Sequence, residues 1–518
     1  MVFCCKIMNM MRRVLDQYES CKTPIRVAFF GFVCIAIGSF VKNPNVNIFY
    51  TFKSNIVLFV AELFLNIGKL AINNLPIIFT LNIVCKKEKN AAPVVLALIG
   101  YFTYLVTTML LANQSLGSQA YANGYGLNSV FNITGSSRLP LETGLIGSFL
   151  VAYATRLSFI MSRHRSNYNL SNIFTKDTAG IVYNVLICFV LGLIMSYAYP
   201  FVYQFIQNGI TFIANDILDP VRIALYTVLD RFLSILGLGN IIRYPFWFTS
   251  LGGSYQNTIT GQSILGDVSI WPFIKENAVD YYGSGRFITP YYVINMFIIP
   301  AFYVATLSCI TDTKEKSSLL LTFIAGILLS VIFGNPLPIE LLMLFTSPVL
   351  LIYYFVLIAA VSFSLVELKA FLGFECSVDN IITSMPGSFP DFIINLRNIN
   401  FSNTLLIIAI VGIVAFGLMF LGTIVYYRYI AFDFSHTGSG DRLIEDIIES
   451  VGGEDNVISA SAGLFKLNIM LKTPELIYIE KMRKIGPRRI NENRDGVSFE
   501  FGSESYAIAK AINKRINK

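Results

Sequence analysis

Nine long apolar runs dominate this sequence, and they constrain its fold more than any other feature. A membrane-spanning helix needs about 20 mostly apolar residues, and the runs approach or exceed that length. They cover residues 26–41, 55–84, 92–112, 143–161, 180–207, 288–311, 317–334, 346–373 and 403–428. A further amphipathic stretch, 217–238, carries four charges at helical spacing on one side: Asp219, Arg222, Asp230 and Arg231. We therefore expect a polytopic α-helical membrane protein of about ten membrane segments.

The composition agrees with a lipid environment and argues against other classes of protein. Hydrophobic residues make up 54% of the chain and charged residues 14%, about half the charged share of a soluble domain. The formal net charge is +7, but the sequence has no basic stripe interleaved with aromatics, so we expect no nucleic-acid partner. The eight cysteines lack metal-ligand spacing and lie in or beside apolar runs. We expect neither a metal site nor a cofactor.

Charges and polar loops predict how the chain is oriented. Basic clusters at 12–13, 86–89 and 156–165 lie at segment ends that would share the cytoplasmic face, together with the C-terminal tail. Two long loops, 113–142 and 249–287, are rich in Gly, Asn, Ser and Tyr. Polar loops of this length in an apolar chain usually cover or line an aqueous site.

The character of the sequence changes near residue 433. Residues 433–440 have the composition of a flexible linker, and residues 441–518 are typical of a compact α/β unit. In that unit we expect helices at 442–451, 474–482 and 503–516, and strands at 456–459, 464–471 and 497–501. About eighty residues are enough to bury a small core. We therefore expect a membrane domain over 1–432 and a separate C-terminal domain over 441–518.

Three stretches carry more information than an ordinary membrane helix. Asn-Leu-Pro-Ile-Ile-Phe occupies 74–79, Gly-Leu-Gly-Asn-Ile-Ile-Arg-Tyr-Pro-Phe-Trp-Phe occupies 237–248, and Gly-Asn-Pro-Leu-Pro-Ile-Glu-Leu occupies 334–341. Glu340 is a carboxylate flanked by prolines between wholly apolar segments, and such groups are rare in membranes unless they have a function. It is a candidate ligand contact; the alternative is a loop carboxylate near the membrane surface.

On these residues the chain resembles the sugar permeases of the bacterial phosphoenolpyruvate-dependent phosphotransferase system, in the glucose/maltose/N-acetylglucosamine superfamily. Members carry related Asn-Leu-Pro and Pro-Phe-Trp-Phe stretches, and a Gly-Ile-Thr-Glu-Pro-Ile-Glu-Phe stretch at the tip of a re-entrant hairpin. The Gly-Gly-x-x-Asn-Val stretch at 452–457 also follows the family's B domain. The resemblance implies a membrane C domain over 1–432, the linker 433–440, and a B-like domain over 441–518.

The resemblance also implies a function, partners and a location. A hexose-type sugar such as glucose would bind at mid-membrane and be moved into the cell with coupled phosphorylation, in a homodimer in the bacterial plasma membrane. The phosphoryl group would come from the system's A-domain protein. The N-terminus and the C-terminal domain would both be cytoplasmic. The implied sugar-binding residues are Glu340, Asn335, Asn240, Arg243 and Trp247, which offer hydrogen bonds and a stacking aromatic ring.

The departures from the family concern its chemistry. Glycine stands at 463, where the family's B domain carries the phosphorylated cysteine, and no cysteine occurs in 377–518. A thiolate is the nucleophile in that step, and Gly463 offers no side chain to replace it. The paired histidines of the family become Gly239 and Asn240, and the first hairpin glutamate becomes Leu337. The chain resembles a protein-phosphocysteine–sugar phosphotransferase, but we expect no catalytic residue in its tail.

Three hypotheses follow from these departures. The chain is an active permease of the phosphotransferase system that uses a B domain supplied in trans, or a degenerate paralogue that serves as a non-phosphorylating transporter, sugar sensor or regulator. The third hypothesis is a structural membrane protein with no ligand. The retained Glu340, Trp247 and Asn-Leu-Pro stretch argue against that third reading.

Overall fold

The computed structural model describes most of the chain. The described residues are 2–42, 54–88, 92–122, 138–163, 176–256, 261, 263–277, 283–374, 386–396, 402–430, 440–485, 487, 489–502 and 504–516. Of the expected linker 433–440, only residue 440 lies among them.

Helices account for most of the described residues before residue 430. By length and composition, eight helical stretches in the described residues are apolar enough to cross a membrane, and two shorter apolar helices accompany them. Helices suit this environment because they satisfy every backbone polar group within one segment. The helices of the first half are α1 (Val2–Lys42), α2 (Asn55–Asn73), α3 (Leu75–Glu88), α4 (Ala92–Leu111), α5 (Gly144–Arg163), α6 (Lys176–Ala214), α7 (Pro220–Ile235) and α8 (Gly239–Phe248).

The second half of this region adds further helices and one short hairpin. The hairpin pairs β1 (Ser254–Gln256) with β2 (Ser263–Leu265) in antiparallel register. The helices are α9 (Asp267–Asn277), α10 (Thr289–Val293), α11 (Ile299–Cys309), α12 (Thr313–Val331), α13 (Leu337–Thr346), α14 (Pro348–Glu367), α15 (Phe389–Leu396) and α16 (Ser402–Val425). A π-helical turn joins α10 to α11, and another, Tyr426–Ile430, extends α16.

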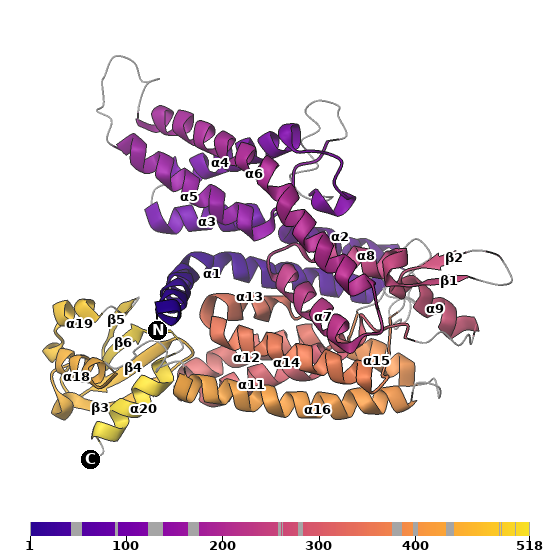
Figure 1. Cartoon of the computed structure of the whole chain (residues 1–518). Coiled ribbons are helices and arrows are strands. Elements are labelled where there is room, and N and C mark those ends of the chain that lie inside the picture. The colour runs from indigo at the N-terminus through magenta and orange to yellow at the C-terminus, as the bar shows by residue number, and fades with distance from the viewer. Residues whose placement is uncertain are drawn as a thin grey trace.

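Helix α1 separates two groups of helices. Helices α3 to α6 pack together on one side of it, whereas α11, α12, α14 and α16 gather on the other side (Figure 1). Helix α7 packs on α14 and leads into α8, and α1 also contacts α13. The β1–β2 hairpin lies at the end of the molecule opposite the C-terminal strands (Figure 1).

Local sequence explains two breaks that shape the interior. The expected run 55–84 divides at Asn74 into α2 and α3, because Asn74 ends α2 and Pro76 lies in the first turn of α3. The run 317–334 ends in a tight turn at Gly334, whose φ of 61° is readily adopted by glycine. Asn335 Oδ1 then accepts a hydrogen bond from the Leu337 N–H at 3.1 Å, which starts α13. This turn places Glu340 in the first turn of α13, as the expected hairpin requires.

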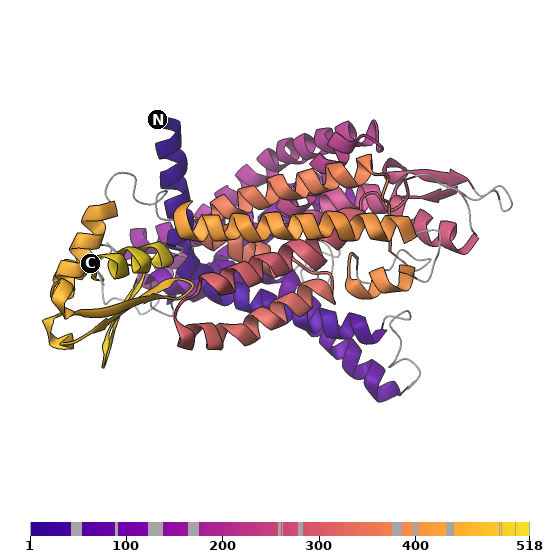
Figure 2. The same ribbon diagram turned by 90° about the horizontal axis from the view of Figure 1, so that it is seen from below.

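The described residues from 440 to 516, called the tail below, contain a four-stranded antiparallel sheet and three helices. The strand order is β3 (Val457–Ala462), β4 (Lys466–Leu471), β6 (Gly496–Glu500) and β5 (Ile490–Asn493). Helix α20 (Ser505–Ile516) packs on β3 and β4, and α18 (Gly440–Ser450) packs on α19 (Ile479–Ile485) and α20. Buried Ile447, Leu467, Val497, Ile508 and Ile512 fill the space between sheet and helices. The tail lies beside the end of α16 and the N-terminal part of α1 (Figure 2).

Candidate functional site

A cavity of about 1030 Å³ opens between α1, α2, the α7–α8 turn and the α12–α13 hairpin. All three informative sequence stretches contribute residues to its wall. Part of the polar loop 113–142 also lines it. The polar lining residues include Asn73, Gln119, Glu142, Arg231, Ser234, Asn240, Arg243 and Asn335.

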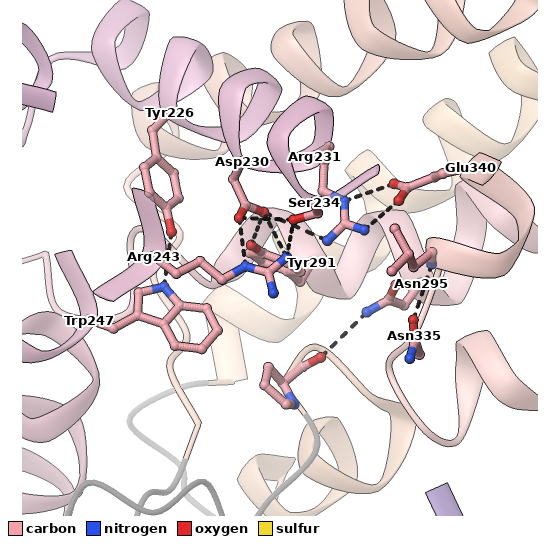
Figure 3. A network of polar contacts seen from close by, with 12 residues as sticks. Tyr226, Asp230, Arg231, Ser234, Arg243, Trp247, Tyr291, Asn295, Asn335 and Glu340 are labelled. Carbon is pink, nitrogen blue, oxygen red and sulfur yellow. Dashed lines mark hydrogen bonds and ion pairs between the residues drawn. The ribbon is translucent and has the colours of Figure 1, made fainter. Parts of the chain in front are cut away.

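A buried ion pair joins α7 to the hairpin behind this wall. Arg231 donates from Nε to Glu340 Oε1 at 2.8 Å and from Nη2 to Glu340 Oε2 at 2.5 Å (Figure 3). The Tyr354 hydroxyl of α14 donates to Glu340 Oε1 at 2.6 Å. Glu340 is fully buried, so its carboxylate depends on these partners for the hydrogen bonds that water would otherwise supply. A two-pronged pair of this kind fixes the orientation of the arginine as well as its charge.

A second buried carboxylate, Asp230, accepts hydrogen bonds from three other side chains. Arg243 of α8 donates from Nε to Asp230 Oδ1 at 2.6 Å and from Nη2 to Oδ2 at 3.3 Å. The Tyr291 hydroxyl of α10 donates to Asp230 Oδ2, and Ser234 Oγ donates to Asp230 Oδ1 at 3.4 Å. Arg243 Nη2 also donates to Ser234 Oγ at 2.6 Å. Figure 3 shows these side chains meeting between α7 and α8.

The two ion pairs form one continuous and balanced network. Arg231 Nη1 lies 3.7 Å from Asp230 Oδ2, so the Glu340 pair and the Asp230 cluster are in contact. Two carboxylates, Asp230 and Glu340, face two guanidinium groups, Arg231 and Arg243, and their formal charges cancel. A buried charge is tolerated when it is paired and hydrogen-bonded, which describes all four groups.

An aromatic wall adjoins the network. Trp247 donates its indole N–H to the Tyr226 hydroxyl at 2.9 Å, which fixes the plane of the ring (Figure 3). The Arg243 guanidinium carbon lies 5.7 Å from the centre of that ring, within cation–π range. Phe374 packs edge-on against Trp247 with ring centres 5.6 Å apart. The indole is therefore held rigidly, and its ring lines the cavity beside Arg243.

The residues expected to bind a ligand occupy two different positions. Arg243, Trp247, Asn240 and Asn335 all line the cavity, although they come from segments almost one hundred residues apart. Glu340 is not among the lining residues. It lies behind Arg231, and Arg231 itself lines the cavity. In this conformation Glu340 therefore reaches the cavity only through the side chain that it orients.

Sequence reasoning missed several members of the network. Asp230 and Arg231 were noted only as charges on an amphipathic stretch, yet the adjacent charged pair in an apolar helix was a usable signal. Ser234, Tyr291 and Tyr354 gave no such signal, because hydroxyl-bearing residues are common in the core of apolar helices. Asp219 and Arg222, from the same stretch, pair with each other at 3.2 Å near the start of α7 and are not among the lining residues.

The cavity carries another carboxylate on the segment that leads into α5. Glu142 Oε1 accepts a hydrogen bond from the Gly144 N–H at 3.2 Å, and the Tyr199 hydroxyl donates to the Glu142 carbonyl at 2.7 Å. Burial raises the pKa of Glu142 to about 7, and the Gly144 hydrogen bond only partly opposes this rise. Glu142 is therefore a cavity group that changes charge near neutral pH.

Neither metal ligands nor the tail contribute to this cavity. Within the part of the chain that the structure describes, no three His, Cys, Asp or Glu residues gather closely enough to hold a metal ion. Gly463 lies in the turn after β3, against Glu315 of α12, and is not a lining residue.

Comparison with known proteins shows the family to which this chain belongs. The family described as "Phosphotransferase system, EIIC" matches residues 23–359, well over half of the chain. Among solved structures, the chain is similar to the transporter ChbC, the IIC component from the N,N'-diacetylchitobiose-specific phosphotransferase system. That match covers 78% of this chain and 93% of the other at 14% sequence identity, with a TM-score of 0.29. On the family match, this multi-pass membrane protein belongs to the EIIC sugar permeases of the phosphotransferase system.

Proposed function

We propose that the chain binds an uncharged hexose-type sugar in the cavity and moves it across the membrane. The observation that carries this proposal is the balanced network of Asp230, Arg231, Arg243 and Glu340 beside the fixed ring of Trp247. Sugar recognition requires several oriented hydrogen-bond groups and an aromatic face. The formal charges of these four groups cancel, so the network leaves no unpaired charge that would call for an ionic ligand, and a neutral polyhydroxylated ligand fits it.

Each lining residue has a distinct part in this proposal. Arg243 uses Nε and Nη2 to contact Asp230 and Ser234, which leaves Nη1 outside this set of bonds to donate to a sugar hydroxyl. Asn240 and Asn335 present amide groups that both donate and accept. Trp247 offers its face to the apolar side of the sugar ring. Glu340 acts as a positioning residue, because it holds Arg231 at the cavity wall.

The family resemblance supplies the remaining parts of the proposal. Residues 1–432 form the permease domain, a homodimer in the bacterial plasma membrane, and residues 441–518 form a B-like domain after the linker 433–440. Both termini face the cytoplasm, in agreement with the basic clusters near the segment ends. In coupled transport, the A-domain protein of the system and a B domain supplied in trans would provide the phosphoryl group, because this chain has Gly463 in place of the cysteine.

A second candidate function is transport or sensing without phosphorylation, and one contact favours it. A Cβ atom built on Gly463 would lie 1.7 Å from Glu315 Oε2, so the place of a side chain at 463 is taken by a carboxylate. A phosphorylated side chain there would also meet this negative charge at close range.

Uptake into vesicles separates the two functions. Radiolabelled glucose, maltose and N-acetylglucosamine are offered with and without phosphoenolpyruvate and the general phosphotransferase proteins. Sugar phosphate that accumulates only with this chain supports coupled transport, and equilibration of free sugar supports the second function. Arg243→Gln should abolish either signal, whereas Arg138→Gln, at an exposed arginine outside the cavity, should not. Absence of any sugar-dependent signal would contradict the proposal.

A further inference from the structure

The tail is attached to the turn between α11 and α12 by paired backbone and side-chain contacts. The N–H groups of Thr311 and Asp312 donate to the Ala462 carbonyl at 2.8 and 3.0 Å. In return, the Ala462 N–H donates to Thr311 Oγ1 at 2.7 Å. Asn468 Nδ2 donates to Asp312 Oδ2. Reciprocal hydrogen bonds of this kind satisfy backbone polar groups on both segments at once. They therefore fix which residue of the tail lies opposite which residue of the turn.

Glu315 completes this attachment at the position where the family's nucleophile is missing. Its Oε1 accepts a hydrogen bond from the Leu464 N–H at 3.2 Å. Its Oε2 lies 1.7 Å from the place that a Cβ at position 463 would occupy, and Gly463 itself is buried. A side chain at 463 would therefore displace the carboxylate and break the Leu464 bond. Glycine at 463 therefore leaves room for the Glu315 carboxylate in this position.

Three further contacts tie the tail to α1 and to the turn that extends α16. Lys22 Nζ of α1 lies 3.4 Å from Glu500 Oε1 of β6. The Arg428 guanidinium, beyond α16, lies over the Tyr506 ring of α20 at 5.8 Å. Lys510 of α20 in turn lies 5.8 Å from the ring centre of Tyr429. The tail thus contacts the middle of α1, the start of α12 and the turn that extends α16, which are distant in sequence but adjacent in Figure 2.

We propose that the tail is a fixed cap on these three helices, in which Glu315 occupies the place of the missing side chain at Gly463. The cap joins the start of α12, which leads into the Glu340 hairpin, to α1, whose far part lines the cavity. The loop 461–464 is then occupied by its contact with Thr311, Asp312 and Glu315, so this loop is closed to a phosphoryl-donor protein. The cap is independent of which sugar the cavity takes, or whether it takes one.

Hydrogen–deuterium exchange on the full chain in lipid nanodiscs tests the cap, read on peptides that cover 309–316 and 460–466. Both peptides should exchange slowly in the native protein. Gly463→Ala should speed their exchange about tenfold, the change expected when a buried hydrogen bond is lost. Glu315→Ala should do the same. Gly463→Ala added to Glu315→Ala should have no additional effect, because the displaced carboxylate is already absent.

Ile458→Ala is the matched control, because Ile458 is 52% exposed on the same strand and takes no part in the contact. It should leave both peptides unchanged. Rapid exchange of both peptides in the native chain, or additive effects of the two substitutions, overturns the cap. If Gly463→Ala does not fold, Asn468→Ala removes one bond to Asp312 and should speed exchange in the 309–316 peptide. Sugar binding is measured separately, so loss of the proposed transport function would not be mistaken for loss of the cap.

Discussion

Arg231 and Glu340 form a two-pronged ion pair across 109 residues of sequence, with N···O distances of 2.8 and 2.5 Å. Their side chains are almost completely buried, at 3% and 0% exposed. The pair connects α7 directly to the hairpin after α12, so the position of one element depends on the other.

Removing one charge of this pair should be more harmful than removing both. Glu340→Gln leaves Arg231 buried without its main partner, and breaking a buried pair in this way costs about 3–5 kcal/mol of stability. The double variant Arg231→Gln/Glu340→Gln should recover part of that loss, because no unpaired buried charge remains. Thermal unfolding in detergent measures both, with Glu367→Gln at an exposed site as control. A double variant less stable than Glu340→Gln would contradict this account.

Asp230 should control sugar affinity through Arg243. Asp230→Asn removes the negative charge that holds the guanidinium, and loss of a charge-assisted hydrogen bond weakens binding by about tenfold or more. Titration with radiolabelled sugar measures the dissociation constant. The exposed Asp216 provides the control Asp216→Asn. An unchanged dissociation constant in Asp230→Asn would show that Arg243 does not depend on this carboxylate.

Tryptophan fluorescence should report the sugar. The chain has two tryptophans, and Trp247 lines the cavity whereas Trp271 does not. Trp247→Phe should abolish a sugar-dependent change in emission and weaken binding by about 1–3 kcal/mol, the range for losing a large aromatic contact. Trp271→Phe should preserve the signal. A signal that survives in Trp247→Phe would place the sugar elsewhere.

Glu142 should make the protein sensitive to pH near neutrality. Its pKa is raised from 4.5 to about 7 by burial, so the folded state favours the protonated form. The stability that this group contributes is fully present below pH 4.5 and is lost as pH rises through 7. The melting temperature of the native chain relative to Glu142→Gln should therefore fall across this window. A constant difference between the two would mean that Glu142 does not titrate there.

Glu315 should give the cap a pH dependence of the same sign. Burial against the tail raises the pKa of its carboxyl, with Asp312 and Glu500 adding to the rise and Lys466 and the Leu464 N–H opposing it. The contact is therefore expected to be firmest at low pH and to weaken as Glu315 ionises. Glu315→Gln keeps an acceptor for Leu464 without the charge. At each pH, exchange of the 460–466 peptide is compared between the two proteins, and an identical pH response in both would exclude Glu315 as the source.

The sequence predicted elements more successfully than contacts. Apolar length located the eight helical stretches that are long and apolar enough to cross a membrane, although the expected run 317–334 is not among them. The Gly-Asn-Pro stretch indicated the turn before Glu340, because a turn of this kind depends on local chemistry. The partner of Glu340 depends instead on how α7 packs against α13, and no local pattern encodes that. The strand β5 was missed as well, since Ile-Asn-Glu-Asn lacks the apolar alternation of a half-buried strand.

Among the site residues too, those in one local motif were predicted and those brought in by packing were not. Arg243, Trp247 and Asn240 lie within one turn-and-helix stretch, so a single motif revealed all of them. Tyr291 and Tyr354 reach the network from separate apolar helices, where a tyrosine is usually an ordinary core residue. The contact of Gly463 with Glu315 also required the tail and the membrane helices to be placed together.

The cancellation of charge among Asp230, Arg231, Arg243 and Glu340 has an electrical consequence. One elementary charge that crosses a potential of 100 mV gains or loses about 2.3 kcal/mol. A network whose charges sum to zero crosses the same field without electrical work, whichever direction it moves. If these four residues move together with a neutral sugar, they therefore add no net charge movement to its transport.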